Sequence, residues 1–134
     1  MNKKPHSKAV DALYKDIASI LHLLHLEHEA ILCVDEGHEI VAFNDGAEKI
    51  FGYKNAEIIG GPLNRLIPSK FHDVHTMHVD AFLEENIRAK LMAQRAPITG
   101  LRKNGEEFTG HASISKFNYG GEKTMTIVLH EIKE

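Results

Sequence analysis

Three histidines at three-residue intervals, His72, His75 and His78, lie in a segment that the sequence predicts to be one helix, residues 69–85. A neutral imidazole nitrogen is a good ligand for iron or zinc. Because a helix turns by about 100° per residue, His75 and His78 fall on one narrow stripe, and His72 lies at its edge. The rest of that stripe is apolar and comprises Phe71, Val74, Ala81 and Phe82.

Imidazoles on an apolar stripe need a partner, because an unpartnered buried polar group costs roughly 1–3 kcal/mol. Three alternatives stay open from the residues alone. His75 is a metal ligand of a cofactor, or it is a packed histidine bonded to the backbone or a neighbouring side chain. In the third alternative, His75 shares a metal ion with His72 or His78, although no carboxylate or cysteine obviously completes such a site.

The strand predicted over residues 106–117 determines the room opposite this helix. Side chains alternate between the two faces of a strand, so Phe108, Gly110, Ala112 and Ile114 share one apolar face. The last predicted strand, residues 123–132, adds three apolar side chains to the same space, namely Met125, Ile127 and Leu129. Small residues in the middle of this face predict a pocket for a flat apolar cofactor. The alternative is that bulky side chains fill the gap, with Phe43, Phe82 and Leu91 as candidates.

Residues 1–27 are predicted to form an amphipathic helix, with Ser7 as the N-cap. Its apolar residues follow the three-and-four spacing of a helix seam and are Val10, Leu13, Ile17, Ile20 and Leu24. Two interpretations remain: the helix packs on its own domain, or it pairs with a second copy of the chain.

The remaining pattern predicts an α+β fold, in which an antiparallel sheet of about five strands carries helices on one face. Glycine-containing turns join strands over residues 30–35 and 39–43, and Asn104-Gly105 marks a hairpin between strands 98–103 and 106–117. Short helices are expected over residues 46–51 and 55–59, and a loop over residues 86–96.

Several sequence segments resemble a PAS domain when they are taken together, and they cover about residues 28–132. They are Asp35–Asn44, Ala47–Tyr53, Glu57–Leu63, Leu66–Pro68, Thr99–Phe108, Gly120–Gly121 and Leu129–Ile132. The resemblance implies the five-stranded PAS fold and a role in sensing, with boundaries at residues 1–27 for the helix and 28–134 for the sensor domain.

The resemblance also implies a homodimer paired through the N-terminal helix, of the kind found in bacterial signalling and two-component systems. An effector domain such as a kinase or cyclase would lie outside this chain. The chain is accordingly expected to be an excised or a stand-alone sensor without catalysis of its own.

Counting forward from Ile67-Pro68, His75 resembles the axial histidine of haem-binding oxygen-sensor PAS domains. The resemblance implies a b-type haem whose iron is bound by His75 Nε2. The other residues expected around the cofactor are His78, Arg95, Ala112, Ile114 and Ile127. The arginine of those sensors would fall at Ala96, but adjacent Arg95, or Arg88 further back, could anchor a haem propionate. The alternatives are a cofactor-free interaction or dimerisation module and a receptor for an unknown small molecule.

Composition narrows the function classes. The 134 residues fit one domain, and a net charge of -3 argues against binding to a nucleic-acid backbone. Cys33 is the only cysteine, so no internal disulfide forms, and no apolar run approaches the length of a membrane span. A cytoplasmic location is therefore expected. Cys33 is predicted to be a small buried residue, and the cysteine motifs of flavin photoreceptors and covalent c-type haem are missing from the sequence.

Overall fold

The structure is a computed structural model that describes residues 6–24, 28–84, 96–119 and 121–132. Five antiparallel strands form one sheet in the order β2-β1-β5-β4-β3, which confirms the predicted α+β fold. The strands are β1 (Ala30–Asp35), β2 (Ile40–Phe43), β3 (Ala96–Leu101), β4 (Glu107–Tyr119) and β5 (Glu122–Glu131). The α-helices are α1 (Lys8–Leu24), α2 (Asp45–Phe51), α3 (Asn55–Ile58) and α4 (His72–Glu84).

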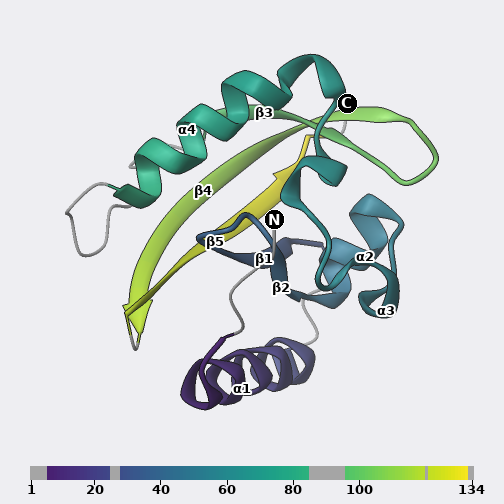
Figure 1. The fold of residues 1–134 in the computed structure, drawn as a ribbon. Helices are drawn as coiled ribbons and strands as arrows, with labels where there is room; N and C mark the ends of the chain where they lie inside the picture. The colour runs from purple at the N-terminus through teal and green to yellow at the C-terminus, as the bar shows by residue number, and fades with distance from the viewer. Residues whose placement is uncertain (1–5, 25–27, 85–95, 120, 133–134) are drawn as a thin grey trace.

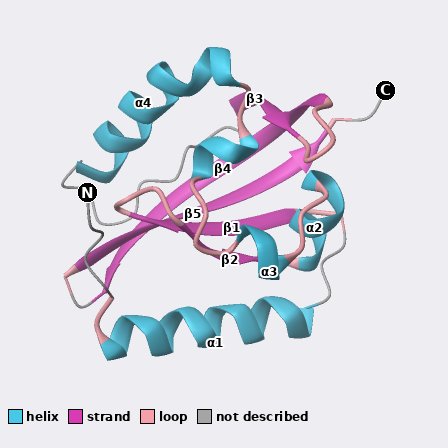
Figure 2. Cartoon of the chain, turned by 45° about the vertical axis from the view of Figure 1, so that its right-hand side comes forward, coloured by secondary structure: helices cyan, strands magenta, loops and turns pink. Residues whose placement is uncertain are grey.

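The two faces of the curved sheet carry different helices, as Figures 1 and 2 show. Alternate residues of β1, Leu32 and Val34, belong to the main core with α2, α3 and α4. Cys33 points to the other face, where it forms a smaller cluster with Ala42 and with Leu21 of α1. We call the face toward α4 the inner face and the face toward α1 the outer face.

Helix α1 begins as predicted, because the Ser7 hydroxyl accepts a hydrogen bond from the Val10 N–H at 3.2 Å. Its buried residues are Val10, Tyr14 and Leu21, which pack toward the sheet. Ile20 of the predicted seam is 56% exposed and does not pack on the domain, because a helix lying on a sheet buries one broad stripe on that side. The structure places α1 on its own domain, and pairing with a second copy stays a prediction.

The turn from β2 into α2 is fixed by Asn44. Its side-chain oxygen accepts from Ala47 N–H at 2.8 Å, which caps α2, and from Ile31 N–H at 2.8 Å, which joins the cap to β1. Gly52 ends α2 with a left-handed φ of 84°, a conformation that glycine adopts without steric cost. The predicted short helices are thus confirmed to within one residue.

The long helix begins later than predicted. Residues Ser69–Phe71 form a 3-10 turn after Pro68, and α4 starts at His72. Strand β3 begins at Ala96, and the rest of the loop expected over residues 86–96 lies outside the described residues. Among the helices that the structure describes, none is both long and apolar enough to cross a bilayer.

Candidate functional site

Helix α4 is tied to the rest of the domain by three hydrogen bonds. Near its start, His72 Nε2 donates to the Ile67 carbonyl at 2.7 Å. Further along, His38 in the β1–β2 turn contacts Asp80 at 2.7 Å through its Nε2. At the end of the helix, the Lys116 ammonium of β4 donates to the Phe82 carbonyl at 2.5 Å. These contacts fix how the helix is rotated above the inner face.

The face that α4 buries differs from the predicted stripe. Val79 and Leu83 are the buried residues of the helix, and His72, His75, Thr76 and Phe82 are half-buried. The exposed residues include His78 together with Phe71, Val74 and Ala81, so the prediction that this stripe faces inward is wrong for these four. The helix turns a different side to the domain than predicted, because Val79 and Leu83 anchor it in the main core. Only His75 and Phe82 of the predicted stripe still face the domain.

His75 carries an unusual buried atom. Its Nδ1 is buried and, within the part of the chain that the structure describes, lacks a hydrogen-bond partner. Burial lowers the pKa of His75 to about 4, and the neighbouring imidazoles of His38, His78 and His72 add to this effect. The side chain is therefore neutral near pH 7, which is the state in which an imidazole binds a metal.

The sheet opposite α4 is apolar, as predicted. Ala112 of β4 is buried, and Ile114 of β4 and Ile127 of β5 are half-buried against the main core. Gly110 was expected to leave room, but a Cβ atom there would lie 2.7 Å from Leu129 Cδ1. The space beside Gly110 is thus filled by Leu129, and the half-buried isoleucines mark the part of the inner face that is less completely covered.

Lys116 is a functional candidate that the sequence analysis missed. It is 7% exposed, and its ammonium lies 5.2 Å from the Phe82 ring centre as well as on the Phe82 carbonyl. A cation suits the carbonyl-rich end of a helix. Alternate residues of a strand share one face, and the residue that follows Ala112 and Ile114 in this alternation along β4 is Lys116. The same rule would therefore have placed Lys116 on the inner face.

Arg95 and Arg102 differ in what the structure describes of them. Arg95, the expected propionate anchor, lies outside the described residues. Arg102 is described and is engaged elsewhere, with two hydrogen bonds to Glu131 at 2.9 and 3.0 Å and one to Glu106 at 2.6 Å. The bonds to Glu131 are the first cause of a raised pKa for Arg102. An open hollow of about 510 Å³ lies beside Arg102, and no predicted site residue lines it.

Cys33 lies away from α4. It is buried in the outer cluster, with its Sγ 3.5 Å from the Thr126 hydroxyl, and burial raises its pKa. The prediction of a small buried residue is confirmed. A thiol on the outer face is poorly placed to react with a group bound between α4 and the inner face.

Comparison with known proteins gives a consistent family. The PAS domain family matches residues 28–134. The sensor protein FixL of Bradyrhizobium diazoefficiens is 29% identical over 113 residues, which are 84% of this chain and 22% of FixL. The oxygen sensor protein DosP of Escherichia coli is 27% identical over 89 residues, which are 66% of this chain and 11% of DosP. The chain therefore spans less than a quarter of the length of these relatives.

Solved structures share the fold. A PAS domain from Colwellia psychrerythraea has a TM-score of 0.69 at 21% identity, covering 90% of this chain and 97% of that one. A PAS domain of an HTR-like protein from Haloarcula marismortui has a TM-score of 0.68 at 15% identity, covering 88% and 98%. The Rhodobacter sphaeroides LOV protein has a TM-score of 0.67 at 15% identity, covering 96% and 70%. At these identities the likeness concerns the fold alone.

Proposed function

This chain belongs to the PAS domain family, and from that premise we propose that it is a gas or redox sensor that binds b-type haem through His75. The observation that carries the proposal is the buried Nδ1 of a neutral imidazole on α4, which has no hydrogen-bond partner among the described residues. Relatives named as FixL and as an oxygen sensor protein support it at 29% and 27% identity.

The residues present suit such a group. His75 would supply the axial ligand, and Ala112, Ile114 and Ile127 would offer an apolar surface on the sheet side. The resemblance assigns Nε2 to the iron, whereas the unpartnered atom is Nδ1, and either nitrogen of a neutral imidazole is able to coordinate metal. Haem would supply an iron atom with an open position for a gas. We keep Arg95 as a proposed propionate partner and place exposed His78 at the margin of the site.

An absorption titration tests this proposal. Haem added to the purified chain is expected to give a stoichiometric Soret band that shifts on exposure to carbon monoxide. His75→Ala should abolish the band, whereas His78→Ala, one turn away on the exposed side of α4, should retain it. Circular dichroism checks that both variants are folded. A band of equal intensity in His75→Ala, or no band in the unmodified chain, would overturn the assignment.

A second candidate is a PAS module without a cofactor, which acts by protein interaction or as a small-molecule receptor. The observation that favours it is the dense packing of Leu129 against Gly110, together with Val79 and Leu83 in the main core. This candidate predicts that the chain stays colourless during the haem titration. Flavin photochemistry is not proposed, because Cys33 lies on the outer face.

We further propose a cytoplasmic homodimer that relays its signal to an effector such as a kinase or cyclase, as in two-component systems. Support for pairing comes from Ile20 and Leu23, which are 56% and 73% exposed on the side of α1 away from the sheet. Ile20→Glu with Leu23→Glu should reduce the mass per particle in sedimentation from two chains to one. Lys15→Glu, exposed on the same helix, is the matched control.

A further inference from the structure

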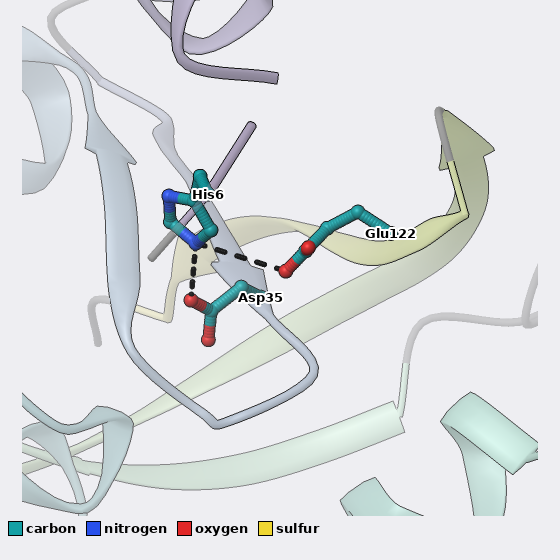
Figure 3. A group of neighbouring side chains, drawn as sticks. All are labelled: His6, Asp35 and Glu122. Carbon is teal, nitrogen blue, oxygen red and sulfur yellow. Dashed lines mark hydrogen bonds and ion pairs between the residues drawn. The ribbon is translucent and has the colours of Figure 1, made fainter. Parts of the chain in front are cut away.

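A second group of potential metal ligands lies on the outer face of the sheet, opposite to the face that α4 covers. It consists of His6, just before α1, Asp35 at the end of β1 and Glu122 at the start of β5, and we call it the N-terminal triad. Figure 3 shows the His6 ring turned so that its Nε2 faces both carboxylates. The Nε2 atom lies 2.8 Å from Asp35 Oδ2 and 3.7 Å from Glu122 Oε1.

The spacing of the three ligand atoms is close to that of a bound cation. All three lie within 4.8 Å of one another. Ligands that sit about 2.0–2.2 Å from a zinc ion in a tetrahedral arrangement are roughly 3.3–3.6 Å apart. The Nε2–Glu122 distance of 3.7 Å is near this value, and the Nε2–Asp35 distance of 2.8 Å needs to open by about 0.5–0.8 Å to reach it.

The surrounding hydrogen bonds orient the ligands. Asp35 is fully buried, and its Oδ1 accepts from Gly37 N–H at 3.0 Å and Glu39 N–H at 2.9 Å. This turn holds the other carboxylate oxygen, Oδ2, toward His6. On the far side of the ring, His6 Nδ1 lies 3.4 Å from Asp11 Oδ1. A carboxylate behind a ligating histidine fixes the tautomer that leaves the opposite nitrogen able to bind metal.

The local charge also favours a cation. Asp35, Glu122 and Asp11 lie around a single imidazole, with carboxylate oxygens 2.8, 3.7 and 3.4 Å from its nitrogens. The negative field extends to Tyr14, whose ring meets His6 edge-on at 5.1 Å. Burial is the main cause that raises the pKa of Tyr14 to about 12, and Glu122 and Asp35 add to it.

We propose that the N-terminal triad binds one divalent transition-metal ion, with Zn²⁺ the best match, and that this ion fastens the segment before α1 to β1 and β5. One imidazole and two carboxylates are a mixed nitrogen and oxygen donor set, which suits zinc better than the all-oxygen preference of Mg²⁺ or Ca²⁺. Three protein ligands leave a fourth position for water. Binding displaces the proton that Nε2 shares with Asp35, and this proton passes to Nδ1 beside Asp11 or to solvent.

Zinc titration of the haem-free, chelator-treated full chain tests the proposal. Calorimetry is expected to show one equivalent of Zn²⁺ bound, with an affinity that falls at least tenfold in His6→Ala and in Glu122→Gln. These variants avoid Asp35, whose change would disturb the turn at Gly37 and Glu39. His130→Ala is the matched control, because that exposed histidine also sits near a carboxylate, with 3.9 Å between Nδ1 and Glu29 Oε1.

Amide hydrogen exchange distinguishes a zinc ion that holds the segment before α1 against the sheet from one that only binds at the surface. Zinc should slow amide hydrogen exchange in α1 of the unmodified chain and of His130→Ala, but not of His6→Ala. Zinc binding that is unchanged in both triad variants, or that shows no saturation at one equivalent, would overturn the proposal. A His75→Ala chain, tested in parallel, should keep the full zinc affinity.

Discussion

The inner and outer faces of the sheet each hold a histidine at the point where a helix meets the strands, and the two histidines differ in their surroundings. His6 on the outer side has three carboxylate groups within 4 Å, of which the closest is 2.8 Å away. His75 on the inner side has apolar strand residues and other imidazoles nearby, and its Nδ1 has no partner in the described part of the chain.

The difference shows how environment sets the chemistry of one side-chain type. The carboxylates around His6 provide oxygen donors and negative charge, which suit a bound metal cation. Burial keeps His75 neutral, so we expect it to favour a metal that binds a neutral imidazole, such as a haem iron. Variants on the two faces test this contrast, and the largest expected change in stability comes first.

Loss of the buried carboxylate on the outer face should lower the free energy of unfolding more than any other single change considered. Asp35→Ala removes a fully buried carboxylate that accepts from Gly37, Glu39 and His6, and we expect it to lower the free energy of unfolding by about 3–5 kcal/mol. Urea denaturation measures the change. Asp80→Ala, which removes an exposed carboxylate bonded to His38, is the control and should cost less than about 1 kcal/mol. Equal losses in the two variants would remove the distinction between a buried anchor and a surface pair.

On the inner face, Lys116 is the charged group that compares with Asp35. Lys116→Met keeps an apolar stem but leaves the Phe82 carbonyl without its 2.5 Å donor, and we expect a loss of about 1–3 kcal/mol. Amide exchange should quicken at the end of α4 and stay unchanged in α1. Lys70→Met is the control, because that lysine is exposed and its 3.5 Å contact with Glu107 lies at the surface. A wild-type exchange rate in α4 of Lys116→Met would show that this bond does not hold the helix.

The sequence predicted most of the fold but only part of the inner site. The correct and the incorrect predictions have different physical reasons. Alternation along β4 placed Ala112 and Ile114 correctly, because period two is enforced by the strand itself. The rotation of α4 depended on Val79 and Leu83 entering a core built from distant strands, which a helical wheel cannot weigh, so His78 was misplaced. The N-terminal triad joins residues 6, 35 and 122, and no local pattern connects such positions.

Because His75 is neutral in the folded chain, we expect the free energy of unfolding to fall as the pH falls. Its folded pKa of about 4 lies below the usual value of 6.5, so the unfolded chain binds the proton more readily. The resulting stability is present above pH 6.5 and is lost as the pH falls toward 4. After allowance for solvent screening we expect about 1–2 kcal/mol. Subtracting the urea-denaturation profile of His75→Leu from that of the unmodified chain should isolate this slope. His78→Leu is the control, and an identical slope in His75→Leu would refute the assignment.

The smallest effect concerns the hydrogen bond that joins α1 to the sheet beside the N-terminal triad. The Tyr14 hydroxyl and the Thr124 hydroxyl are 2.8 Å apart and buried, so a double-mutant cycle of Tyr14→Phe and Thr124→Val should give a coupling of about 0.5–1.5 kcal/mol. Alkaline absorption titration should place the pKa of Tyr14 at about 12 in the unmodified chain and lower in Glu122→Gln, because Glu122 helps to raise it. His130→Ala should leave that pKa unchanged. If Glu122→Gln also leaves it unchanged, the negative field inferred around His6 does not reach Tyr14, and the electrostatic contrast between the two faces is smaller than their geometry implies.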